Sequence, residues 1–194
     1  MMIVGITGGI GCGKSTVARI FETLEIAVYN SDIRSKVLLN TKAELKTSLI
    51  AEFGKEIYTA TGINRSYFAS LIFNNKDKLA RSNQIIHPFV RKDFEDWVKV
   101  QTSSYVIKES AILFETGIYQ QLDKTILVTA PEKLRINRVM KREHIPVKVV
   151  LERINNQWKD VKKEALADYV IVNDETQLLL PQVLEIHDFF MKDA

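Results

Sequence analysis

The sequence has very few of the residues that form crosslinks or zinc sites. Its 194 residues include one cysteine, Cys12, and 3 histidines, which excludes an internal disulfide and a four-ligand zinc site of finger-like spacing. It lacks any apolar run of about 18 residues, and Met1–Thr7 is too short for a signal peptide. We therefore expect a soluble protein of the reducing cytoplasm with no membrane partner.

A large excess of one charge is also absent. Lysine and arginine number 27, aspartate and glutamate number 24, and the net charge of +3 is too small to indicate a general nucleic-acid binder. Hydrophobic residues make up 46% of the chain, enough to bury one substantial core and a small additional lobe. We expect one principal domain that is a monomer or a weak oligomer and binds no nucleic acid.

Short apolar runs alternate with longer segments of helical periodicity. Short strands separated by helices are typical of parallel sheets that are covered on both faces. The pattern therefore predicts an α/β fold with a five-stranded parallel sheet. The predicted strands are 3–6, 27–29, 105–107, 125–129 and 169–172.

The longest interval between predicted strands lies between Ile33 and Ser104. It spans roughly 70 helical and charged residues, with interruptions at Gly54 and Gly62. Pro88 is expected to open a helix at its first turn. A crossover between parallel strands needs far fewer residues, so the interval predicts an inserted helical lobe that holds a second substrate.

A second helical segment runs from Pro131 to Lys163 and is the most arginine-rich part of the chain. Pro131 and Pro146 both suit helix starts. We interpret this segment as a lid. The chain is accordingly divided into a nucleotide-binding core (1–33, 87–134 and 165–194), a helical substrate-binding insertion (34–86) and the lid (135–164).

The segment Gly8–Ser15, which we name the phosphate loop, matches glycine, any four residues, glycine, lysine, serine or threonine. Glycines let the backbone turn its N–H groups toward phosphate oxygens, and the following helix adds partial positive charge. Lys14 is placed to reach the β- and γ-phosphates, and Ser15 to coordinate Mg²⁺. Because the loop follows an apolar strand and precedes an amphipathic helix, it predicts nucleotide binding rather than a structural glycine turn.

Cys12 lies within the phosphate loop, near Lys14 and a helix amino terminus, which both lower the pKa of a thiol. We favour the interpretation that it is an inert small residue. The alternative is an accessible thiol whose alkylation blocks ATP by its bulk.

The patterns of a signalling GTPase are missing. None of Gly54, Gly62 and Gly117 has an aspartate three residues earlier, and the Asn-Lys-Asp of 75–77 lacks the spacer of a guanine-reading motif. A kinase that acts on a small hydroxylated substrate is therefore favoured.

The chain resembles the dephospho-CoA kinase family along nearly its whole length. The resemblance begins with Gly-Ile-Thr-Gly-Gly-Ile-Gly over 5–11. The later matches, in the family's order, are Asp32, His87-Pro88, Leu113-Phe114-Glu115, Arg138, Arg142, Gln157 and the Ala-Asp-Tyr-Val-Ile-Val-Asn of 167–173. The chain departs from the family at Asn30, Cys12 and Ala111, where aspartate, serine and proline are usual.

This resemblance implies a three-layer P-loop nucleotide-kinase-like fold, with ATP and dephospho-CoA as substrates and Mg²⁺ as cofactor. The implied reaction phosphorylates the ribose 3′-hydroxyl of dephospho-CoA to form coenzyme A, the final step of its biosynthesis in this family. Asp32 would accept or orient the hydroxyl proton, at the strand end where open parallel sheets bind ligands. Lys14 and Arg138 would neutralise the phosphates.

The predicted site residues fall into groups beside the catalytic Asp32, Lys14 and Arg138. Dephospho-CoA is expected to contact Asp32, His87 and Glu115, while Mg²⁺ is expected to contact Ser15 and, more weakly, Glu109. The expected nucleotide contacts are Gly8, Gly9, Gly11, Cys12, Gly13, Lys14, Ser15, Thr16, Arg142 and Asn173.

Three arginines of the predicted lid share one helix face. At about 100° per residue, Arg135, Arg138 and Arg142 fall within an arc of roughly 60°, which suits a polyphosphate. The alternative is a solvated basic face, to which Arg135, Lys141 and Arg153 would belong.

Several candidates have structural alternatives. Asp32 could instead be a helix N-cap. For Glu109 we favour a solvated charge at a strand end over the role in the magnesium site. Glu115 could instead form a local cap or ion pair. His87 could be a capping or packing residue, and Asn173 could form a turn.

Two alternative functions remain open. One is another small-molecule or nucleotide kinase of the same fold, which a screen of acceptor substrates would distinguish. The other is a nonenzymatic nucleotide-binding switch, which would bind ATP without turnover.

Overall fold

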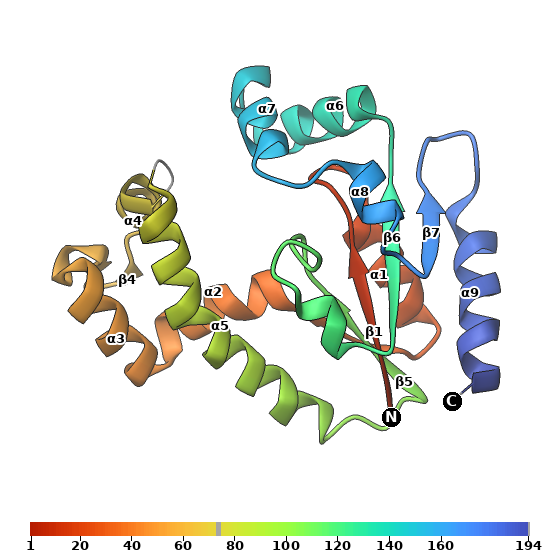
Figure 1. Ribbon diagram of the computed structural model, residues 1–194, viewed down its shortest axis with the longest axis horizontal. Helices are drawn as coiled ribbons and strands as arrows, with labels where there is room; N and C mark the ends of the chain where they lie inside the picture. Colours follow the sequence, from red (N-terminus) through yellow and green to blue (C-terminus); the bar gives the residue numbers. More distant parts are fainter. Residues whose placement is uncertain (73–74, 194) are drawn as a thin grey trace. The chain divides into compact units, whose positions relative to one another are not determined.

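The computed structural model describes residues 1–72 and 75–193, which form two compact units. The first unit joins Met1–Asn30 to Gln101–Ala194, and the second is Ser31–Val100. The predicted insertion, 34–86, lies within the second unit. That unit extends to residue 100 because one helix, α5, continues through the expected boundary (Figure 1).

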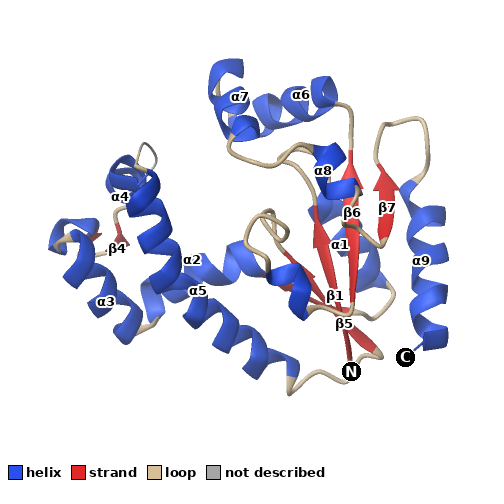
Figure 2. Cartoon of the chain, viewed as in Figure 1, coloured by secondary structure: helices blue, strands red, loops and turns tan. Residues whose placement is uncertain are grey.

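The first unit contains a five-stranded sheet in the order β2-β5-β1-β6-β7 (Figure 2). Every neighbouring pair is parallel, which confirms the predicted sheet. β1 is the central strand, with β2 and β5 on one side and β6 and β7 on the other. Open parallel sheets bind ligands at the carboxyl ends of their strands. The strands are β1 (Met2–Thr7), β2 (Ala27–Asn30), β5 (Tyr105–Glu109), β6 (Lys124–Thr129) and β7 (Tyr169–Val172).

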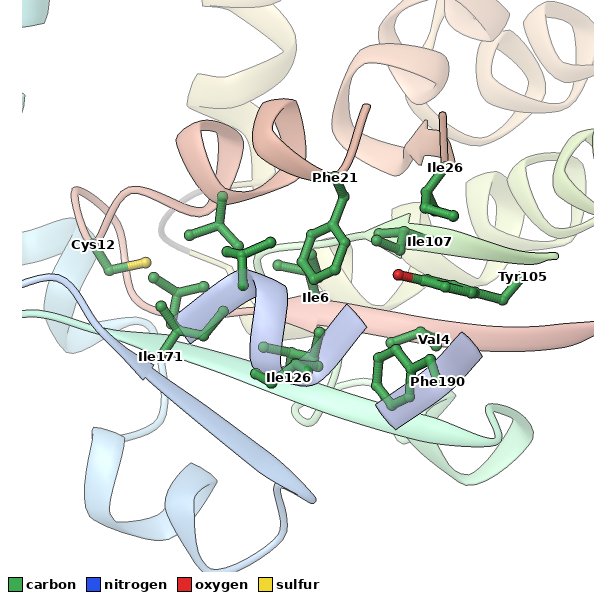
Figure 3. Packing of buried hydrophobic residues seen from close by; sticks show 14 of the residues in the cluster. Val4, Ile6, Cys12, Phe21, Ile26, Tyr105, Ile107, Ile126, Ile171 and Phe190 are labelled. Carbon is green, nitrogen blue, oxygen red and sulfur yellow. The ribbon is translucent and has the colours of Figure 1, made fainter. Parts of the chain in front are cut away.

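Helices α1 (Lys14–Thr23) and α9 (Leu179–Asp193) cover one face of this sheet. Val4 of β1 packs there with Phe21 of α1 and Phe190 of α9 in one apolar cluster (Figure 3), and all three side chains are fully buried. Burial of each such side chain contributes about 1.5–3 kcal/mol. This cluster holds the first helix, and with it the end of the phosphate loop, against the sheet.

The opposite face of β1 is covered by the segment 110–123, which includes a 3-10 helix at Ile118–Gln121. A Cβ at Gly5 would lie 2.5 Å from Leu122 and 2.7 Å from Leu113, so the segment packs directly on the strand. Both faces of the sheet are therefore covered, which confirms the expected layered α/β fold.

The predicted lid segment consists of helices, and Pro131 and Pro146 directly precede two of them, as the sequence predicts. The last of these helices packs beside β6. The helices are α6 (Glu132–Glu143), α7 (Val147–Asn155) and α8 (Asp160–Glu164).

The prediction that Pro88 opens a helix is wrong. Pro88 lies inside α5 (Lys76–Val98), which begins after Asn75, whose side chain accepts a hydrogen bond from Lys78 N at 3.0 Å. A proline within a helix removes one backbone hydrogen bond. The helix continues past it because residues on one face, such as Phe94, are buried.

The other elements of the second unit are short. Gly54, with φ of 88°, ends α3, and Arg34 of α2 forms a bidentate pair with Asp93 of α5 at 2.7 and 2.8 Å. Across residues 1–72 and 75–193, no helix has the length and apolar composition that a membrane span requires. The elements are α2 (Ser31–Thr41), α3 (Ala43–Phe53), a 3-10 helix (Lys55–Ile57), β3 (Tyr58–Thr59), β4 (Gly62–Ile63) and α4 (Arg65–Ile72).

Candidate active site

The phosphate loop connects β1 to α1 at the carboxyl edge of the sheet. Because β1 ends at Thr7 and α1 begins at Lys14, the strand, loop and helix occur in the predicted order. Gly13 has φ of 98°, and a Cβ there would lie 2.1 Å from Asn173 Nδ2. A side chain at this position would strain the backbone and displace Asn173, so the loop requires glycine here.

Lys14 and Ser15 are the first two residues of α1, and Thr16 follows in the same turn. Lys14 Nζ donates a hydrogen bond to Gly8 O at 2.9 Å, so the ammonium group lies over the start of the loop. The amino terminus of the helix directs its unpaired N–H groups and its partial positive charge to the same region. This arrangement can hold a polyphosphate.

Glu109, the last residue of β5, is 5% exposed. Its Oε1 accepts a hydrogen bond from Ser15 Oγ at 2.8 Å, and its Oε2 accepts one from Asn30 Nδ2 at 2.6 Å. Asn30 and Glu109 occupy equivalent positions on the adjacent strands β2 and β5, which explains their contact. The favoured interpretation of Glu109 as a solvated strand-end charge is therefore wrong.

The oxygens of Ser15 and Glu109 fit the chemistry of Mg²⁺. The ion prefers oxygen ligands at about 2.1 Å in octahedral geometry, so adjacent ligands lie about 3 Å apart, which is close to the 2.8 Å between Ser15 Oγ and Glu109 Oε1. In the part of the chain that the structure describes, no group of three or more histidine, cysteine, aspartate or glutamate side chains could hold a metal ion.

Arg138 of α6 lies against the phosphate loop. Its guanidinium donates to Gly11 O at 3.4 Å, to Asn173 O at 3.2 Å and to Glu175 at 3.0 Å. Asn173, which follows β7, donates through Nδ2 to Cys12 O at 2.8 Å. Arg138 and Asn173 thus hold the loop between α6 and the end of β7.

The three arginines of α6 have different partners in the structure. Arg135 is 6% exposed and pairs with Asp160, whereas the Arg142 side chain is 63% exposed and pairs with Glu143 at 2.6 Å. The hydrogen bond from Arg142 lowers the pKa of Glu143. The helical spacing was correct, but the three side chains reach different partners. The solvated-face alternative therefore fails for Arg135.

Glu115 forms local contacts. Its Oε1 accepts a hydrogen bond from Trp158 N at 3.0 Å and lies 2.9 Å from the buried Nζ of Lys163. The local ion pair that was the structural alternative for Glu115 is therefore present. The pair joins the segment after β5 to α8.

Two residues of the family pattern have roles that the sequence alone did not indicate. Gln157 accepts a hydrogen bond from Ile10 N at 2.8 Å and donates to Ala111 O at 3.2 Å. Asp168 accepts from Thr125 N at 2.8 Å and from Thr125 Oγ1 at 2.7 Å. Gln157 therefore supports the phosphate loop, and Asp168 joins β6 to the start of β7.

Asp32 and His87 belong to the second unit. Asp32 is exposed and is the second residue of α2, so it does not have the N-cap position that was its structural alternative. Its helix starts directly after β2 in the sequence. His87 is half-buried within α5.

Cys12 is fully buried in the apolar cluster, beside Ile171 in Figure 3. Burial raises the pKa of its thiol and outweighs the opposing effect of Lys14. The residue therefore behaves as a small apolar side chain, which agrees with the favoured interpretation of the sequence.

We expect Cys12 to react with iodoacetamide at least about 100-fold more slowly in the folded protein than in the unfolded chain, because the thiolate is disfavoured and the sulfur is inaccessible. Mass spectrometry of timed samples measures this rate. Labelling of the folded protein at the rate of the unfolded chain would show that the loop opens readily.

Comparisons with known proteins identify relatives over nearly the whole chain. The family model for dephospho-CoA kinase matches residues 2–178. The dephospho-CoA kinase of Porphyromonas gingivalis is 40% identical over 187 residues, which cover 96% of this chain and 93% of that protein.

Solved structures share the fold. A crystal structure of a protein from Thermus thermophilus has a TM-score of 0.87 and 29% identity, and it covers 97% of this chain and 96% of its own. The structure of the dephospho-CoA kinase from Campylobacter jejuni has a TM-score of 0.68 and 22% identity, with 99% and 98% covered. Because the family model matches residues 2–178 and a relative is 40% identical over 187 residues, the chain belongs to the dephospho-CoA kinase family.

Proposed function

We propose that this chain transfers the γ-phosphoryl group of ATP to the ribose 3′-hydroxyl of dephospho-CoA, with release of ADP and coenzyme A. The observation that carries the proposal is the cluster of Lys14, Ser15 and Glu109 at the phosphate loop, in a chain that matches the family over residues 2–178. The product is the final one of coenzyme A biosynthesis.

The phosphate loop binds ATP in this proposal. Lys14 and Arg138 neutralise the charge that develops on the transferring group, because both cations lie against the loop. Asn173 and Arg142 are the further nucleotide contacts. The bond of Asn173 to Cys12 O at 2.8 Å fixes it at the end of β7, beside the loop.

Ser15 and Glu109 are the residues that would hold Mg²⁺. When bound, the ion neutralises charge on the β- and γ-phosphates. Asn30 donates to the second oxygen of Glu109 at 2.6 Å and so fixes the orientation of the carboxylate. An asparagine here also avoids the repulsion that a second carboxylate would bring.

Asp32 acts on the acceptor hydroxyl. It is exposed in the first turn of α2. An ionised carboxylate can accept the proton of the 3′-hydroxyl and orient that oxygen toward the γ-phosphate. His87 and Glu115 are the further proposed contacts of dephospho-CoA.

The proposal is tested by the Mg²⁺-dependent release of ADP from ATP with dephospho-CoA as acceptor. Adenosine, pantothenate, cytidine monophosphate and no acceptor are the comparison reactions. Selective turnover with dephospho-CoA supports the proposal. Turnover with another acceptor would support a kinase of this fold that acts on a different substrate. ATP binding without turnover would favour a nonenzymatic nucleotide-binding switch. We also propose that the protein is a monomer or a weak oligomer and that it works in the cytoplasm.

Glu109→Gln is expected to raise the Mg²⁺ concentration for half-maximal turnover about tenfold, because a neutral amide is a weaker ligand than a carboxylate. A titration of ADP release with MgCl₂ at fixed ATP measures the change. Glu22→Gln, at an exposed position of α1, is the control for the loss of one negative charge. If the two variants required the same Mg²⁺ concentration, Glu109 would not be a ligand of the metal.

A further inference from the structure

Arg135 is a charged residue in the buried stripe of α6. It is 6% exposed, and Val139, one turn later on the same face, is fully buried. A guanidinium is costly to bury unless it is paired. The residues that contact Arg135 therefore indicate its role. The Arg135–Asp160 pair plays no part in the phosphoryl transfer proposed above.

The side chain of Arg135 packs directly against the phosphate loop. A Cβ at Gly9 would lie 1.9 Å from Arg135 Nη1 and 2.9 Å from Cζ. At Gly11 it would lie 2.5 Å from the backbone oxygen of Arg135. The backbone of Gly9 is not in the left-handed region, so the guanidinium, and not the backbone conformation, excludes a side chain at Gly9.

Asp160 completes the contact. Arg135 Nη1 donates to both of its carboxylate oxygens, at 2.9 and 3.2 Å, and Asp160 is the first residue of α8. An Asp160 oxygen would also lie 3.4 Å from a Cβ at Gly9. The ion pair therefore joins α6 and α8 at the point where both meet the loop.

The neighbours of this pair contact the loop as well. Gln157, three residues before Asp160, accepts the hydrogen bond of Ile10 N at 2.8 Å. Arg138, one turn after Arg135, donates to Gly11 O at 3.4 Å. The predicted lid segment thus contacts three consecutive residues of the loop, and the buried ion pair lies at the first of them.

We propose that Arg135 is a positioning residue that, with Asp160, fixes the 9–11 turn of the phosphate loop and the place of Arg138 beside it. Arg135 binds no phosphate itself, because its side chain is buried and its Nη1 donates to Asp160. Its loss displaces the loop and weakens nucleotide binding. The inference rests on the proposed binding of ATP at this loop.

Gly9→Ala, Arg135→Gln and the double variant test the contact between the two residues. The dissociation constant of a fluorescent ATP analogue with Mg²⁺ is measured for each. Gly9→Ala and Arg135→Gln alone are each expected to weaken binding about tenfold. In the Arg135→Gln background, Gly9→Ala should add less than about twofold, because the atoms that exclude the methyl group are gone.

Further variants separate positioning from a general loss of stability. Arg135→Lys keeps the charge and should recover part of the affinity for the ATP analogue. Asp160→Asn, an isosteric change, should weaken this affinity several-fold. It replaces Arg135→Gln in the test if that variant does not fold. The KM for dephospho-CoA should change less than about twofold, since only the nucleotide side is displaced. Lys133→Gln, an exposed change on the same helix, is the control.

Equal effects of Gly9→Ala in the two backgrounds, or unchanged nucleotide affinity in Arg135→Gln and Asp160→Asn, would overturn the positioning role alone. Failure of the wild-type protein to bind the ATP analogue would instead overturn the proposed function. The two failures are therefore distinguishable.

Discussion

Asp32→Asn is expected to lower kcat about 1,000-fold and to change the affinity for ATP less than about twofold. Asparagine keeps the shape of the side chain but cannot accept the proton of the acceptor hydroxyl. ADP release at saturating ATP and dephospho-CoA measures kcat, and binding of a fluorescent ATP analogue measures the affinity. A loss in kcat alone identifies a group that acts after both substrates are bound.

Asp77→Asn is the matched control for this change. Asp77 is the second residue of α5, as Asp32 is of α2, and both side chains are exposed. Each substitution removes one favourable charge from a helix amino terminus, worth about 0.3–1 kcal/mol. Equal kcat for the two variants would reduce the role of Asp32 to this helix-terminus effect.

The sheet could be predicted from the sequence because short, nearly continuous apolar runs are typical of strands that are buried on both faces. Val4 and its neighbours are buried on both sides of the strand, and such runs fit only a covered sheet. The phosphate loop was predictable for a similar reason, since its glycines and Lys14 are adjacent in sequence. Local patterns therefore identified the elements that local contacts define.

Pro88 and Arg135 show where such patterns fail. Proline favours a helix start, but the buried face of α5 and the cap at Asn75 place the start 12 residues earlier. Arg135 resembles a residue of a solvated basic face, yet its spacing of four from the buried Val139 was a signal that it lies in the apolar stripe. Its partner, Asp160, comes from another helix and could not be inferred.

Glu109 shows the same limit at the site itself. Its position at the end of a predicted strand was evident, but its exposure depended on which strands lie beside it. The sheet order places β5 between β2 and β1, which brings Asn30 and Ser15 to either side of its carboxylate. Strand order is a property of the whole fold, so sequence spacing alone wrongly favoured a solvated Glu109.

Arg138→Gln is expected to lower kcat about 1,000-fold, because a guanidinium beside the phosphate loop stabilises charge on the transferring phosphoryl group. Arg138→Lys should recover only part of this rate, since an ammonium group lacks the planar set of donors. The rate is measured as ADP release at saturating substrates, and single-turnover experiments separate the chemical step from product release.

Lys141→Gln, an exposed change on the same helix, is the control for the loss of one positive charge. Arg138 also donates to Asn173 O at 3.2 Å and to Glu175 at 3.0 Å, so its removal releases the residues after β7 as well as a cation. Glu175→Gln removes that ion pair and keeps the arginine. If Glu175→Gln lowered kcat as much as Arg138→Gln, the arginine would act by anchoring this segment. A large loss in Arg138→Gln alone would instead assign the effect to its charge at the phosphates.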